Sequence, residues 1–140
     1  MIRHNKLPDN IIDLIPDAAY YLERRDDVIF AYLFGGLAKG DPNPLSDIDI
    51  AVYLSINVDF AHEKAEILED IVDILHTDEI DLVVLNQSSI LLSMNVIKHN
   101  RVLVDKNPFM RHAFQSLIMR KYFDHQQFES AILRRRFYHG

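Results

Sequence analysis

The sequence predicts an α/β (α+β) fold, a mixed sheet of about four strands covered by helices. Two observations lead to it. Segments with apolar residues at helical spacing alternate with short runs rich in β-branched and aromatic residues, with Gly, Pro, Asn and Ser between them. In addition, 49% of the 140 residues are hydrophobic, which is enough to bury a core without disulfides in a chain that has no cysteine. We therefore expect one domain over residues 1–140.

Four longer helices are expected, each starting at a residue that can cap or open a helix. Their expected ranges are 9–25, 59–76, about 89–99, and a long terminal helix from about 108. The residues that start them are Asp9, Asp59, Ser88 or Ser89, and Asn107-Pro108.

Four strands are expected between these helices. Their ranges are 28–34, 47–54, 80–85 and 101–104. The first strand ends at Gly35-Gly36, and Gly40, Pro42 and Pro44 follow. Because these residues interrupt regular structure, any helix after the glycine pair must be short.

Composition and charge narrow the class of protein. The net charge of −6 argues against direct, general nucleic-acid binding, which needs a clustered positive surface. No apolar stretch approaches the ~20 residues that cross a bilayer, and the N-terminal residues do not resemble a signal segment. We expect a soluble, cytoplasmic protein that does not bind membranes.

Two carboxylates interrupt the second expected strand. Since side chains alternate across a strand, Asp47 and Asp49 face one side while Ile48 and Ile50 face the other. Neighbouring ionised carboxylates repel each other and lose hydration unless a cation compensates, and carboxylate oxygens suit Mg²⁺ or Mn²⁺. A single Asp-x-Asp is also compatible with a strand end that merely reaches solvent.

A third acid comes from the next strand. Asp81 lies near the start of the run 80–85, so a neighbouring strand can bring it to the same patch. Asp78 and Glu79 compete for this role, but they lie in the preceding turn. We therefore select Asp81.

The pair Gly35-Gly36 allows a tight turn and a close approach of the backbone to a ligand such as a phosphate. Alone, the pair is also explained as a plain turn at the end of a strand. Followed after ten residues by Asp47-Ile48-Asp49, and later by a strand that carries an acid, it becomes a specific pattern.

The segment FGGLAKGDPNPLSDIDIAVYL, followed by EIDLVVLN, resembles the Gly-Ser-x10-Asp-x-Asp signature of the polymerase-β-like nucleotidyltransferases. It is similar above all to the minimal nucleotidyltransferases (MNT), the MntA-type antitoxins paired with HEPN toxins. The resemblance runs from Val28 to Val104. One position departs from the signature, since Gly36 stands where the family has Ser.

The resemblance implies a nucleotidyltransferase palm with ATP as substrate and a site for two Mg²⁺ ions, with Mn²⁺ as an alternative. The implied catalytic and metal-binding residues are Asp47, Asp49 and Asp81. The expected nucleotide contacts are Gly35 and Gly36, with Lys39 and Ser46 as further candidates from their positions near the glycines and the aspartates. Lys39 is equally explained as a solvated loop residue, and Ser46 is better explained as the start of the strand.

The implied function is that of an antitoxin that transfers AMP from ATP to a tyrosine of its HEPN RNase toxin and forms a hetero-oligomer with it. Two alternatives stay open. One is an antitoxin that neutralises the toxin by binding alone, with Gly36 marking lost catalysis. The other is transfer of a nucleotide to a small molecule such as an aminoglycoside.

Overall fold

The computed structural model describes residues 8, 10–38 and 47–138, with side chains up to residue 136. Its elements follow the predicted order. They are α1 (Ile11–Arg24), β1 (Val28–Phe34), α2 (Gly35–Ala38), β2 (Ile48–Leu54), α3 (Phe60–Leu75), β3 (Ile80–Val84), the 3₁₀ helix η1 (Leu85–Gln87), α4 (Ile90–Lys98), β4 (Asn100–Asp105) and α5 (Pro108–Tyr138).

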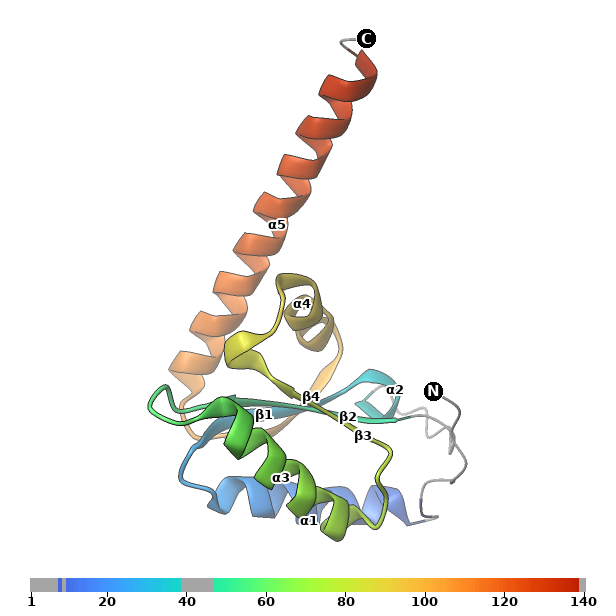
Figure 1. Cartoon of the computed structure of the whole chain (residues 1–140), viewed down its shortest axis with the longest axis vertical. Coiled ribbons are helices and arrows are strands. Elements are labelled where there is room, and N and C mark those ends of the chain that lie inside the picture. The colour runs from blue at the N-terminus through green and yellow to red at the C-terminus, as the bar shows by residue number, and fades with distance from the viewer. Residues whose placement is uncertain (1–7, 9, 39–46, 139–140) are drawn as a thin grey trace.

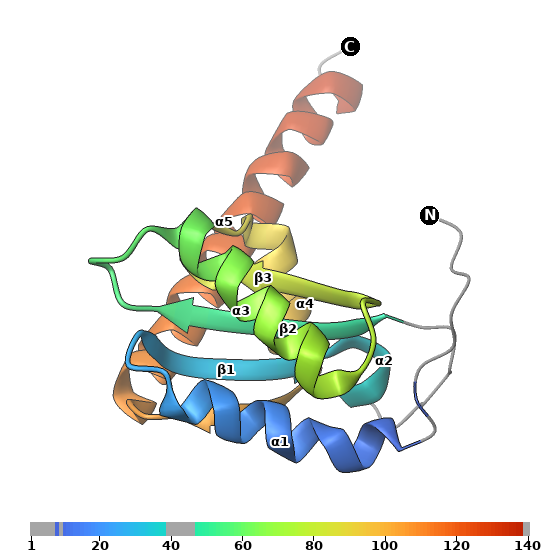
Figure 2. The same ribbon diagram turned by 60° about the horizontal axis from the view of Figure 1, so that its bottom comes forward.

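The four strands form one mixed sheet in the order β3-β2-β1-β4 (Figures 1 and 2). β1 pairs antiparallel with both β2 and β4, whereas β2 and β3 run parallel. The parallel pair is connected through α3, as parallel strands require a crossover. The predicted fold class and number of strands are confirmed.

Helices cover the two faces of the sheet unequally. α1 and α3 lie side by side on one face (Figure 2), where Leu22 and Ile71 belong to a core cluster with residues of β1, β2 and β3. On the other face, Val96 of α4 and Phe114 of α5 pack with Phe30 of β1. This second face carries the smaller cluster.

The helix starts agree with the expected residues in three cases, of which α5 is described below. The Asp59 side chain accepts hydrogen bonds from the N–H groups of Ala61 (3.1 Å) and His62 (3.3 Å), and Ser89 accepts one from Leu92 N–H at 3.1 Å. α1 instead has Asn10 as its N-cap, without a side-chain hydrogen bond. Asp9 lies outside the described residues.

Other boundaries moved by one or two residues. β2 begins at Ile48 rather than at Asp47, and β3 ends at Val84 because Leu85 starts η1. β4 begins at Asn100 and ends at Asp105, one residue beyond the expected strand at each end. Strand ends depend on pairing with neighbouring strands, which no local pattern shows.

The terminal helix α5 has 31 residues and extends far beyond the rest of the fold (Figure 1). It begins at Pro108, whose missing N–H costs nothing in the first turn, and the side chain of Asn107 accepts a hydrogen bond from Met110 N–H at 3.0 Å. Among the described residues, no helix combines the length and the apolar character needed to span a bilayer.

Candidate active site

Asp47 and Asp49 lie at the start of β2, and both are half-buried. The even-numbered side chains of this strand join the core cluster beneath α1 and α3: Ile48, Ile50, Val52 and Leu54. Ala51 belongs to the opposite cluster, beneath α4. Because side chains alternate along a strand, Asp49 shares the face of Ala51. Asp49 is thus on the sheet face that lies away from α1 and α3, and Asp47 immediately precedes the strand.

Asp81 comes from β3 and pairs with Asp49 in the parallel register. It is exposed, and Val83, two residues later, lies in the same cluster as Ala51. Of the two competing acids, Asp78 is exposed and Glu79 is buried, and the carbonyl of Glu79 accepts the N–H of Ile48 at 2.9 Å. The register therefore brings Asp81 beside Asp49, and the alternation puts both on one face.

Gly35 lies against the Asp49 carboxylate. The end of β1 delivers it there, since Phe34 pairs with Asp49 across the antiparallel ladder. Gly35 has φ +73°, and a Cβ atom at this position would be 2.2 Å from Asp49 Oδ2. Only glycine leaves room for this contact and adopts this backbone conformation without strain. The backbone of the loop thus reaches the carboxylate directly.

The remaining predicted nucleotide contacts are placed only in part. Gly36 is half-buried in α2, a helix of four residues, as expected for the short segment after the glycine pair. Lys39 and Ser46 lie outside the described residues. The described part of the predicted site therefore consists of Gly35, Gly36 and the three aspartates.

Mg²⁺ and Mn²⁺ prefer oxygen donors such as carboxylates. The three aspartates therefore have the ligand chemistry that such an ion needs. The backbone of Gly35 supports this fit, because the absent side chain lets the Asp49 carboxylate lie where a Cβ atom at position 35 would be. No group of three or more acidic, histidine or cysteine side chains within the described ranges converges closely enough to hold a metal ion. The three carboxylates would have to come closer together to hold one.

A hollow of about 250 Å³ opens beside Asp81. Lys64 of α3 and Leu92 of α4 form part of its walls, and Gln87 and Ser88 complete the polar lining. The sequence analysis did not select Lys64. Only the packing of α3 beside β3 brings this lysine near an acid that lies 17 residues later in the chain, and no local pattern signals it.

The comparison with family models decides the family. Residues 17–109, more than half of the chain, match the model described as polymerase beta, nucleotidyltransferase. The chain belongs to the polymerase-β nucleotidyltransferase family. Membership confirms the fold expected from the glycine pair and Asp-x-Asp, and it makes the chain a nucleotidyltransferase by family. The comparison with curated proteins gave no match.

Solved structures similar to this nucleotidyltransferase come from toxin–antitoxin complexes. One, a toxin–antitoxin with AMP-PNP, is 26% identical with a TM-score of 0.71, and the match covers 84% of this chain and 94% of the other. Another is the complex of an MNT antitoxin with the tri-AMPylated HEPN toxin of Shewanella oneidensis, with 24% identity, a TM-score of 0.67 and coverage of 86% and 94%. A third is an MntA–HpeT toxin–antitoxin mutant, with 27% identity, a TM-score of 0.66 and coverage of 91% and 96%. The expected resemblance to the MntA-type antitoxins is therefore confirmed.

Proposed function

We propose that this nucleotidyltransferase is an antitoxin that transfers AMP from ATP to a tyrosine hydroxyl of a HEPN toxin, and thereby neutralises the toxin. The observation that carries the proposal is the pairing of Asp49 with Asp81, together with the packing of Gly35 on the Asp49 carboxylate. Two neighbouring strands therefore place their acids next to each other, and the backbone of a glycine approaches one of these acids. Such an arrangement suits a reaction in which a triphosphate and a hydroxyl must be held together.

The transfer is a substitution at the α-phosphorus of ATP. The tyrosine oxygen forms a bond to this phosphorus, the bond to the oxygen that bridges the α- and β-phosphates breaks, and pyrophosphate leaves. In our proposal the Asp81 carboxylate orients the attacking hydroxyl and accepts its proton. Its exposure supports this role, because the hydroxyl belongs to another protein and must approach from solvent.

Asp47, Asp49 and Asp81 would hold Mg²⁺ or Mn²⁺, with two ions in the full site. The charge of these ions lowers the pKa of a bound hydroxyl and neutralises the triphosphate. Gly35 and Gly36 let the backbone approach the phosphates, and in our proposal Lys39 and Ser46 add contacts to them. Gly36 lacks the serine hydroxyl of the family signature, so its contribution is through the backbone alone.

The proposed partner is a HEPN toxin, and the two proteins form a hetero-oligomer. Support comes from the similar solved structures, which are toxin–antitoxin complexes, one with AMP-PNP and one with a tri-AMPylated HEPN toxin. The organisation of residues 1–140 as a single domain, and the cytoplasmic location, stay predictions.

The test uses the purified chain, ATP, Mg²⁺ and the HEPN toxin proposed as its partner. We expect the intact mass of the toxin to rise by whole adenylyl units, with the adduct on a tyrosine. Asp49→Asn and Asp81→Asn should abolish the increase while the complex still forms, because a neutral amide is a poor ligand for Mg²⁺ and a poor acceptor for the proton. Asp78→Asn, an exposed acid in the adjacent turn, is the matched control and should keep full activity.

If the wild-type chain neutralises the toxin without any change of mass, and Asp81→Asn does so equally well, binding alone is the function. Mass increase in the Asp49→Asn and Asp81→Asn variants at the rate of the wild type would remove these residues from the mechanism. If the chain transfers the nucleotide to a small molecule such as an aminoglycoside and not to the toxin, the acceptor is a small molecule and the proposed function is wrong.

A further inference from the structure

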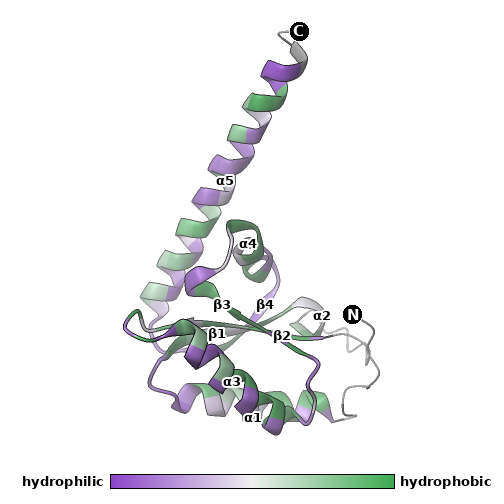
Figure 3. Cartoon of the chain, viewed as in Figure 1, coloured by the Kyte–Doolittle hydropathy of each residue, from purple (hydrophilic) through white to green (hydrophobic). Residues whose placement is uncertain are grey.

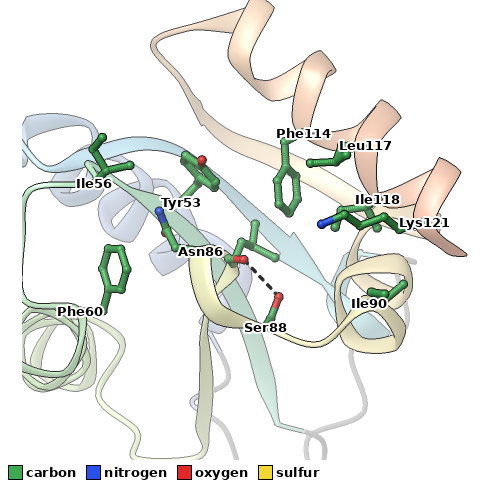
Figure 4. Close-up of a pocket in the computed structure, with 11 residues that line it drawn as sticks. Tyr53, Ile56, Phe60, Asn86, Ser88, Ile90, Phe114, Leu117, Ile118 and Lys121 are labelled. Carbon is green, nitrogen blue, oxygen red and sulfur yellow. Dashed lines mark hydrogen bonds between the residues drawn. The ribbon is translucent and has the colours of Figure 1, made fainter.

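A cavity of about 440 Å³ lies between α5 and the carboxyl ends of β2 and β3 (Figure 4). Tyr53 and Phe60 line it from one side, and Phe114, Leu117 and Lys121 face it from α5. Asp49 lies four residues before Tyr53 and the intervening Ala51 is fully buried under α4, so the cavity is separated from Asp49 along β2. It adjoins the hollow beside Asp81, because Ser88 lines both.

A stripe of side chains continues from this cavity along α5. Its members recur at intervals of three or four residues, which places them on one side of the helix: Phe114, Leu117, Lys121, His125, Phe128 and Ile132. We call these six residues the α5 stripe. Its first and last residues are 18 positions apart, or about 27 Å at the rise of an α-helix. That length exceeds a single side chain or a small ligand and matches another helix.

The far part of the stripe has no cover in this chain. Phe128 is 65% exposed and Ile132 42% exposed, and over residues 123–136 every side chain is exposed except the half-buried His125. Figure 3 shows apolar and polar bands alternating along this part of α5. Exposed large apolar side chains also occur on the other side of α5, at Met119 and Phe123, but Phe128 and Ile132 continue the line of side chains that starts in the cavity. Exposed apolar side chains continuous with a cavity indicate a binding surface.

Charge favours one kind of occupant. Residues 120–136 contain five Lys or Arg against two Asp or Glu, whereas the whole chain carries −6. Within the stripe, Lys121 is the cationic member, and Arg135 follows on the same side, whereas His125 already lies 3.2 Å from Glu129 of the same helix. Pairing with the same stripe of a second copy would bring these basic groups together, which is unfavourable. An acidic partner would neutralise them.

We propose that the α5 stripe and the cavity at its base form the docking surface for an α-helix of the partner toxin, with apolar residues along its contact side and Asp or Glu beside them. Leu117 and Phe114 at the cavity anchor one end of this helix, and Phe128 and Ile132 contact the other. The geometry is that of a helix packed along a helix and into a groove. The identity of the partner rests on the proposed function.

The test compares two double variants of the full chain that introduce the same charges. Phe128→Glu/Ile132→Glu alters the stripe, whereas Met119→Glu/Phe123→Glu alters the opposite side of α5, where both residues are also exposed, at 52% and 58%. Affinity for the HEPN toxin of the proposed function is measured by titration calorimetry. We expect the stripe variant to bind at least about tenfold more weakly and the control variant to stay within about threefold of the wild type.

Higher salt should weaken wild-type binding, because the proposed partner is acidic. Equal affinities of the two variants, or a larger loss in the control, would overturn the docking surface even where the wild type still adenylylates the toxin, and the proposed function would stand. Absence of wild-type binding and modification would overturn both. Sedimentation showing that the stripe variant dissociates a dimer of the chain alone would assign the surface to a second copy instead.

Discussion

At the end of β1, the backbone of Gly35 lies so close to the Asp49 carboxylate that a methyl group has no space between them. The contact is set by the antiparallel pairing of Phe34 with Asp49, which fixes how far the chain can move away. Position 35 therefore requires a positive φ and the absence of a side chain, and only glycine meets both requirements.

Gly35→Ala should consequently destabilise the fold by about 1–3 kcal/mol, through backbone strain and displacement of Asp49, and should abolish nucleotide transfer. Urea unfolding gives the first quantity and the mass assay of the toxin the second. Ala38→Gly, at the end of the same short helix, is the control for a change of helix propensity alone, and it should cost at most about 1 kcal/mol. Normal transfer by Gly35→Ala would show that Asp49 does not need its present position.

At the scale of elements, Arg25 joins α1 to α3. Its guanidinium pairs with Asp27 at 3.0 Å and with Glu63 and Glu66 of α3 at 2.5 and 2.9 Å, and it donates a hydrogen bond to the Tyr21 hydroxyl at 3.0 Å. The Tyr21 hydroxyl in turn donates to the Asp70 carboxylate of α3. The pairing with Asp27 raises the pKa of the Arg25 guanidinium, which stays charged. This network keeps the two helices in contact on the face opposite the candidate site.

Because of this network, the free energy of unfolding should change with pH in the alkaline range. Burial, and then the hydrogen bond to Asp70, raise the pKa of Tyr21 from 10.0 to about 12. Since the folded state binds this proton more tightly than the unfolded state, the stabilisation is complete below pH 10 and is lost as the pH rises from 10 to about 12. Urea unfolding across this range should show a steeper fall of the unfolding free energy for the wild type than for Tyr21→Phe.

Tyr20→Phe is the matched control, because Tyr20 is the adjacent residue of α1 and is 62% exposed. It should keep the pH dependence of the wild type. Identical slopes for Tyr21→Phe and the wild type would mean that the Tyr21 hydroxyl is not held by the α1–α3 contact.

At the scale of the whole molecule, α5 divides into a part that packs on the sheet and a part that extends from it (Figure 1). The first part is anchored by Ile118, which is buried, and by a hydrogen bond from Gln115 Nε2 to the Tyr32 hydroxyl at 2.6 Å. Arg111 adds a salt bridge to Asp105 of β4 at 3.0 Å. The second part, residues 123–136, is exposed apart from the half-buried His125.

A chain that ends at residue 122 should therefore unfold within about 3 °C of the full chain, because the deleted residues contribute little to its core. Ile118→Ala in the full chain should instead cost about 2–4 kcal/mol, since it removes buried methyl groups. Differential scanning calorimetry measures both. A large loss of stability in the truncated chain would mean that the far part of α5 supports the fold.

The sequence alone located the strands and the side of β2 that carries Asp47 and Asp49. These features depend on local properties of the sequence, which a few neighbouring residues are enough to show. They are the alternation of side chains, capping residues such as Asp59, and the interruption of regular structure by glycine and proline. The choice of Asp81 over Asp78 and Glu79 also came from local position, since only Asp81 lies within the strand.

Only the tertiary structure shows which residues from distant segments lie next to each other. The pairing of Asp49 with Asp81, the contact of Gly35 with Asp49 and the approach of Lys64 to Asp81 join segments far apart in the chain. Strand order and register depend on the packing of the whole core, which no short segment encodes. For the same reason the sequence analysis could not tell which turns of α5 would be buried. Only the packed sheet and α4 show that the stripe begins under cover at Phe114 and ends in solvent at Ile132.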